Sequence, residues 1–170
     1  MTTLILTVSG ADRPGLVSAV ADVVDAHGGN WENSRLAELA GTFAGVVEVS
    51  VPATRAEELR AALGALDGLL AVTVQTGAED AATESGSQRI SLGVLGNDRP
   101  GIVREVSGVL AAHALSIEDM TTVTRDAAMA GGRLFESTVT ATVPASADID
   151  ALRTALERIA SEIQVDISLG

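Results

Sequence analysis

Asp12-Arg13-Pro14-Gly15 recurs as Asp98-Arg99-Pro100-Gly101, and this repeated tetrapeptide decides how the chain is organised. The copies begin at positions 12 and 98 of 170 residues, so each stands near the start of one half. Alternating apolar residues precede both copies, and the two histidines, His27 and His113, follow them at the same spacing. Such a period indicates one module duplicated, and the function of the motif is expected to be present twice.

Composition restricts the class of protein and its partners. The formal net charge is −12, from 11 basic and 23 acidic residues, and aromatic residues make up 2%. A surface of this kind repels phosphate backbones and offers no platform for bases, so direct binding of nucleic acid is not expected. The chain has no cysteine, and no apolar run reaches the ~18 residues that a membrane span needs. We expect a cytoplasmic protein without direct membrane contact.

Each half shows the same order of predicted elements. Period-2 alternation predicts strands, and a 3.6-residue apolar period predicts helices. The first half gives a strand at 4–9, a helix at 16–27, strands at 30–39 and 43–51, a helix from Thr54 and a strand at 70–74. The second gives a strand at 90–95, a helix at 102–113, strands at 116–125 and 135–143, a helix from about Ile149 and a strand at 165–169.

This βαββαβ order predicts an α+β fold. We expect two ferredoxin-like modules, at 1–77 and 89–170, each a four-stranded antiparallel sheet with both helices on one face. The acidic and polar residues 78–88 are expected to be an exposed linker. Because the second half is six residues longer around 126–132, we expect a longer hairpin loop there.

Local signals mark the helix ends. Asp12 and Asp98 are expected to cap the first helix of each half, with Pro14 and Pro100 in its first turn. The second helix of the first half should begin with a capping box of Thr54 and Glu57.

The stop signals of the two halves differ. Gly28-Gly29 is a strong signal for a helix end, whereas Ala114-Leu115, at the same place in the second half, is a weaker one.

The order of elements, with Gly-x-Asp-Arg-Pro-Gly between the first strand and the first helix, resembles the ACT domain over about 2–77 and 89–169. Two such modules in one chain resemble the glycine cleavage system transcriptional repressor family. ACT domains commonly bind small molecules, often amino acids, at the interface of two such domains, and the resemblance implies which residues line that site. They are Gly10, Asp12, Arg13, Pro14, Gly15, Leu16, Asn30 and Trp31 in the first module. In the second they are Gly96, Asn97, Asp98, Arg99, Pro100, Gly101, Ile102, Ser116 and Ile117.

The residue types of these loops suit a free amino acid. The N–H groups at Gly15-Leu16 and Gly101-Ile102 begin a helix and can bind a carboxylate, and glycine lets a ligand approach the backbone. An oxygen of Asp12, Asp98 or Asn30 could accept the ammonium group. The alternative is that the motif is only a good helix start.

The arginines and the differences between the halves leave two questions open. Arg13 and Arg99 could pair with a carboxylate or with an acidic neighbour in the other half, or could be solvated turn residues. Asn97 replaces Ala11, and Ser116 replaces Asn30, which leaves open whether both halves bind equally.

Other chemistry is not expected. Two histidines are too few ligands for a metal site, and their place in a last helical turn is explained by the helix dipole. No cofactor is expected, and Trp31 is expected to cover a core or an interface. Neither central strand holds the Asn that acylphosphatase-type catalysis requires, so an enzyme is the less favoured alternative.

The expected partners follow from the module size and the resemblance. Two small apolar modules predict a homodimer with a two-fold axis. The resemblance implies a glycine or serine ligand and a DNA-binding regulator protein as partner, while an assembly module that binds no ligand is the alternative.

Overall fold

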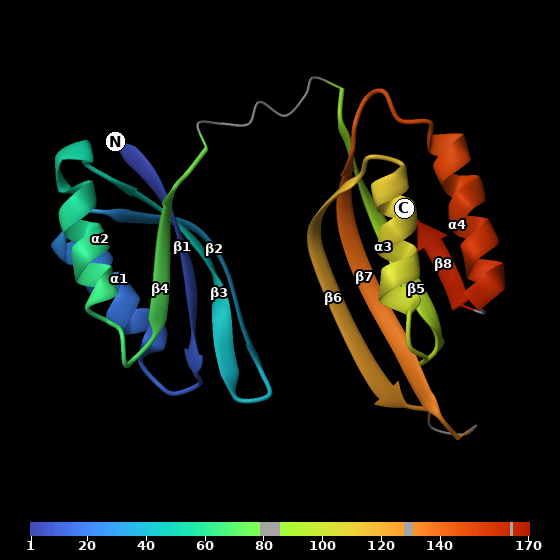
Figure 1. Ribbon diagram of the computed structural model, residues 1–170, viewed down its shortest axis with the longest axis horizontal. Coiled ribbons are helices and arrows are strands. Elements are labelled where there is room, and N and C mark those ends of the chain that lie inside the picture. Colours follow the sequence, from blue (N-terminus) through green and yellow to red (C-terminus); the bar gives the residue numbers. More distant parts are fainter. Residues whose placement is uncertain (79–85, 128–130, 164) are drawn as a thin grey trace. The chain divides into compact units, whose positions relative to one another are not determined.

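The computed structural model describes residues 1–78, 86–127, 131–163 and 165–170, and the chain divides into two units, Met1–Ala81 and Ala82–Gly170 (Figure 1). The expected linker falls mostly at 79–85, outside the described residues, as do Glu79 and Asp80. The first unit contains β1 (Thr2–Ala11), α1 (Leu16–Ala26), β2 (Asn30–Leu39), β3 (Thr42–Val51), the short 3-10 helix η1 (Ala53–Arg55), α2 (Ala56–Gly64) and β4 (Ala71–Thr76). The second contains β5 (Gln88–Asn97), α3 (Ile102–Ala112), β6 (Ser116–Asp126), β7 (Arg133–Val143), α4 (Ile149–Ile163) and β8 (Val165–Leu169).

Both units have one topology, which confirms the predicted α+β fold class. The sheets have the orders β2-β3-β1-β4 and β6-β7-β5-β8, and every neighbouring pair is antiparallel. The duplication extends to the register. Leu6 pairs with Val47 on one side and Val74 on the other, while Leu92, at the same place in the second unit, pairs with Val139 and Leu169.

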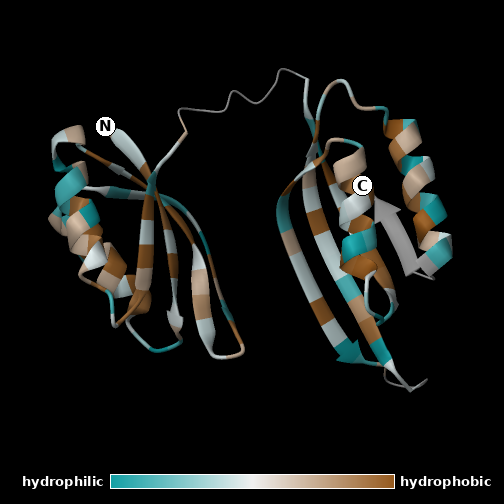
Figure 2. Cartoon of the chain, in the orientation of Figure 1, coloured by the Kyte–Doolittle hydropathy of each residue, from teal (hydrophilic) through white to brown (hydrophobic). Residues whose placement is uncertain are grey.

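The alternation along the strands buries one face of each sheet under its helices (Figure 2). In β1, Leu4, Leu6 and Val8 are buried, whereas Thr7 is exposed. Each fully buried Leu contributes about 1.5–3 kcal/mol, so this face drives the packing. The first core also takes Leu16, Val20 and Val24 from α1, Val47, Val49 and Val51 from β3, and Ala56, Leu59 and Leu63 from α2.

The second core repeats this arrangement with Leu92 and Val94 of β5, Ile102, Val106 and Leu110 of α3, and Leu152, Leu156 and Ile159 of α4. Among the described residues of this unit, one polar side chain is buried. Ser137, 3% exposed, donates from its hydroxyl to the Thr121 carbonyl oxygen at 3.0 Å, which satisfies the buried group. Gly45 holds the corresponding place in the first unit.

The helix starts differ from the prediction. The N-cap residues are Gly15, at φ 92°, and Gly101, at φ 97°, and neither helix has a side-chain cap. The prediction that Asp12 and Asp98 cap these helices is therefore wrong, because the cap is a residue without a side chain. The prolines stand one residue before the cap, in the turn, and not in the first helical turn. Since the left-handed region strains other residues, the backbone conformation itself favours the glycine of the motif.

The expected capping box of α2 is also wrong. Thr54 lies inside η1, and α2 begins at Ala56 after an N-cap Arg55 without a side-chain cap hydrogen bond. The two acidic residues of its first turn, Glu57 and Glu58, pair instead with Arg60 and Arg55 at 3.2 and 3.3 Å.

The first helix of both units ends in the same way. Gly28 has φ 68°, and the next N–H, of Gly29, donates to the Val24 carbonyl at 2.9 Å. Ala114 adopts φ 60°, and the N–H of Leu115 donates to the Leu110 carbonyl at 3.0 Å. The weaker signal thus forms the same left-handed stop, with Ala in a conformation that favours glycine.

The hairpins carry the expected length difference. Leu39 and Thr42 pair around Ala40-Gly41, whose φ angles of 50° and 79° suit a two-residue hairpin turn. In the second unit the pairing continues to Asp126 and Arg133, and the N–H of Ala127 donates to the Gly132 carbonyl at 3.0 Å. Residues 128–130 lie outside the described part.

Candidate functional site

The loop between β1 and α1 is fixed by two other loops of the first unit. The backbone N–H of Asp12 donates to the Gly41 carbonyl of the β2–β3 hairpin at 2.9 Å. The guanidinium of Arg13 donates to the carbonyls of Gly68 and Leu69, before β4, at 3.1 and 2.9 Å. These contacts hold an exposed loop in one place without using the start of α1.

The start of α1 is open on the side of Gly15. A Cβ placed on Gly15 would have no heavy atom within 4 Å, apart from its immediate neighbours in the chain. The first turn of α1 holds no acidic residue, and its start has no side-chain cap. A helix N-terminus in this state presents N–H groups and partial positive charge, which favour an anion.

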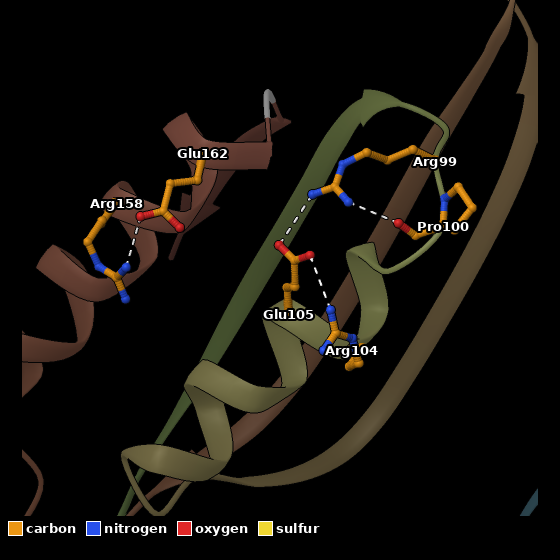
Figure 3. Close-up of polar contacts among 6 residues, drawn as sticks. All are labelled: Arg99, Pro100, Arg104, Glu105, Arg158 and Glu162. Carbon is orange, nitrogen blue, oxygen red and sulfur yellow. Dashed lines mark hydrogen bonds and ion pairs between the residues drawn. The ribbon is translucent and has the colours of Figure 1, made fainter.

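Arg99 of the loop between β5 and α3 pairs with a side chain from the first turn of α3 (Figure 3). The N–H of Asp98 donates to the Arg133 carbonyl at 2.8 Å, which repeats the attachment to the hairpin. The guanidinium of Arg99 donates to the Pro100 carbonyl at 2.9 Å and to Glu105 Oε2 at 3.2 Å. Arg104 Nη2 lies 3.6 Å from Glu105 Oε1, so one carboxylate faces two arginines.

The predicted residues of β2 do not join the loop of their own module. Asn30 pairs with Ser50, and Ser50 with Thr3, at the end of the sheet where β1 begins, whereas the loop follows the other end of β1. A ten-residue strand at about 3.3 Å per residue separates the two ends. Ser116 and Ile117 likewise stand at the start of β6, where Ser116 pairs with Thr142. One module therefore brings together Gly10 to Leu16, or Gly96 to Ile102, without its strand residues.

Asn30 is engaged by a carboxylate at its own end of the sheet. Its amide Nδ2 donates to Glu32 Oε1 at 3.0 Å, and the Ser50 hydroxyl donates to the same oxygen at 2.5 Å. The Ser50 bond, and after it the Asn30 bond, holds the pKa of the Glu32 carboxyl below its ordinary value of 4.5. Trp31 is half-buried against the first core, as expected.

The histidines are the C-caps of α1 and α3. His27 Nδ1 lies 2.7 Å from the Val23 carbonyl oxygen, which explains this side chain by local helix structure. Within the described part of the chain, no group of three or more His, Cys, Asp or Glu side chains could hold a metal ion. No helix among the described residues is long and apolar enough to cross a membrane.

Several residues at the site are not predicted by the sequence patterns. The backbone carbonyls of Gly41, Gly68 and Leu69 hold the first loop. Because every residue has a carbonyl, such contacts cannot be predicted from residue type. Glu105 could have been identified from the sequence, because aligning the two repeats places it opposite Ala19. A further hollow of about 540 Å³ lies on strands of the first unit and contains none of the predicted residues. It is lined by Ile5, Asn33, Ser34, Arg35, Val46 and Glu48.

Comparison with known families agrees with this architecture. Models of the ACT domain match residues 2–76 and residues 90–161, one in each unit. The chain therefore belongs to the ACT domain family and carries two ACT domains in tandem.

Two relatives of this chain are named as transcriptional repressors. The glycine cleavage system transcriptional repressors of Escherichia coli K12 and Shigella flexneri are each 28% identical over 170 residues, covering 98% of this chain and 88% of theirs. These relatives are regulators and not enzymes, in agreement with the expectation of a non-catalytic protein.

Solved structures extend the likeness to the whole fold. An unknown protein from Galdieria sulphuraria is 30% identical with a TM-score of 0.89, covering 99% of this chain and 96% of that one. A structure assigned as a glycine cleavage system transcriptional repressor is 19% identical with a TM-score of 0.71, over 99% of this chain and 96% of its own, and shares the fold.

Proposed function

We propose that this chain is a regulatory protein that binds a small amino acid at its ACT loops and acts through contacts with another protein. The observation that carries the proposal is the loop before α1. It is fixed by Arg13 and the Asp12 backbone, it leaves the uncapped helix start open beside Gly15, and it stands in a tandem ACT protein.

The two charged groups of an amino acid have matching groups in the loop. The carboxylate would accept from the backbone N–H groups of Leu16 and Val17 at the start of α1, where the helix dipole favours negative charge. The carboxylate of Asp12, an exposed residue three positions before the N-cap Gly15, would bind the ammonium group. Because Asp12 is not the helix cap, its charge can serve a ligand without loss of the helix start.

A second module would complete this site. Asn30 and Trp31 lie at the far end of the sheet from the loop of their own module, so they can reach a loop only from another ACT domain. We therefore propose a site between two modules and a two-fold symmetric homodimer, since such symmetry would form the same site twice.

The relatives suggest what the ligand regulates. Because they are named as repressors of the glycine cleavage system, glycine or L-serine is the first ligand to test, and amino-acid metabolism the first pathway. The net charge of −12 opposes contact with DNA, so we propose that the protein acts in the cytoplasm on a DNA-binding regulator.

A thermal-shift panel of the twenty amino acids, each at millimolar concentration, tests the class of function. A ligand that binds only the folded state adds about 2.7 kcal/mol of stability at a hundredfold excess over Kd. We expect glycine or L-serine to raise the melting temperature, and Asp12→Asn with Asp98→Asn to weaken that rise in a folded protein. If no amino acid raises it, the alternative, an assembly module without a ligand, takes the place of this proposal.

A further inference from the structure

We propose that the Glu105 carboxylate closes the loop of the second module, so that only the first module's loop accepts an amino acid. This inference rests on the proposed function and adds which of the two copies takes the ligand. It comes from one difference between the repeats, Glu105 in the second module and Ala19 in the first.

The second loop already contains a carboxylate. Glu105 stands one turn into α3, where its N–H donates to the Gly101 carbonyl at 3.0 Å. Its Oε2 lies 3.2 Å from Arg99 Nη2, and its Oε1 lies 3.6 Å from Arg104 Nη2 (Figure 3). A Cβ on Gly101 would lie 3.4 Å from Glu105 Oε1 and 3.5 Å from Arg99 Nη1. Glu105 and Arg99 thus fill the space beside the glycine.

The first loop has the same backbone without this carboxylate. Ala19 takes the place of Glu105, and its N–H donates to the Gly15 carbonyl at 2.9 Å. Ser18 takes the place of Arg104. The guanidinium of Arg13 bonds to two carbonyl oxygens, which carry no net charge and leave its positive charge available. The space beside Gly15 is open.

Competition decides between the loops. A ligand carboxylate at the start of α3 would lie beside the negative charge that Glu105 already places in the first turn of this helix, and two like charges repel each other. An attached group competes at an effective concentration on the order of millimolar. A free amino acid at a lower concentration therefore loses to Glu105 but meets no such competitor at Gly15.

The test is a titration of the full chain with glycine, and separately with L-serine, followed by the backbone amide signals of both helix starts in two-dimensional NMR. In the wild type, the amides of Leu16 and Val17 should shift and saturate. Those of Ile102 and Val103 should stay in place up to a concentration at least about tenfold higher. Glu105→Ala, which copies the first module, should make both pairs respond.

Two matched variants complete the design. Ala19→Glu copies the second module into the first and should weaken the response of Leu16 and Val17 at least about tenfold. Glu162→Ala removes a carboxylate of α4 that lines one hollow with Arg104 and Glu105 but pairs with Arg158, at 2.8 Å, and it should leave the second loop closed (Figure 3). Circular dichroism identifies any variant that does not fold. If Glu105→Ala does not fold, Glu105→Gln replaces it, since this variant keeps the size of the side chain, removes its charge and should also open the loop.

The outcomes separate the two proposals. Equal midpoints at both helix starts of the wild type would overturn the role of Glu105 and leave the amino-acid sensor intact. A second loop that stays silent in folded Glu105→Ala and Glu105→Gln, while the first responds, would also overturn it. No response at either start, in the wild type or the variants, would overturn both proposals.

Discussion

Arg13 and Leu69 are joined by a 2.9 Å hydrogen bond from the guanidinium to the backbone carbonyl, across 56 residues of sequence. Together with the bond to Gly68, this contact means that Arg13 of the repeated motif connects the β1–α1 loop to the turn before β4. The corresponding Arg99 instead bonds within its own loop and to Glu105. The same motif therefore fixes the turn before β4 in the first module and neutralises a carboxylate in the second.

Replacing Arg13 should loosen the first module. Arg13→Ala removes both bonds to the turn, and because they are exposed we expect a loss of about 1 kcal/mol in the free energy of unfolding. Faster amide hydrogen exchange at Leu70 and Ala71 should accompany it. Arg99→Ala is the control, since it should leave exchange before β4 unchanged. Equal exchange in wild type and Arg13→Ala would contradict the fastening role.

The helix stops predict a pair of opposite stability changes. Ala114 has φ 60°, a conformation that costs a non-glycine residue about 1 kcal/mol, so Ala114→Gly should raise the free energy of unfolding by up to that amount. Gly28→Ala, at φ 68°, should lower it by a similar amount. Urea denaturation measures both. A loss of stability in Ala114→Gly would show that the loop entropy of glycine outweighs the relief of strain.

Glu32 predicts a dependence of stability on acid. The pKa of Glu32 in the folded protein lies below 4.5. Its contribution to folding stability is therefore fully present above the pKa of the unfolded chain, and it is lost as the pH falls through the folded pKa. Ser50→Ala removes the main cause and should move the Glu32 pKa, read from carboxyl NMR signals, back toward 4.5. Ser34→Ala, at an exposed serine on β2, the strand of Glu32, should not move this pKa. An unchanged Glu32 pKa in Ser50→Ala would show that the hydroxyl does not act on it.

Much of the fold could be predicted because period and repetition are local properties of the sequence. The alternation of Leu4, Leu6 and Val8, and the spacing of Leu16, Val20 and Val24, identify the buried faces directly. The residue that caps the first helix of each module was harder to predict from the sequence. Asp, Pro and Gly all occur at helix starts, and only the left-handed backbone at Gly15 shows that glycine is the cap.

The site could be predicted only in part, for a topological reason. The loop and the start of β2 were expected to line a site at the interface of two ACT domains. Within one module they lie at opposite ends of the sheet, as the pairing of Asn30 with Ser50 shows. Which side chains fill a loop depends on distant contacts, as Arg13 shows. Glu105, by contrast, is a difference between repeats that sequence comparison alone can find.

A calorimetric titration of the wild-type chain with glycine and with L-serine tests the central claim most directly. The account predicts saturable binding of one of them, loss of binding when its carboxylate is esterified, and weakened binding in Asp12→Asn. These results follow because the helix start requires the free carboxylate and Asp12 the ammonium group. Absence of heat at millimolar concentrations of both, or equal binding of the amino acid and its methyl ester, would contradict the account.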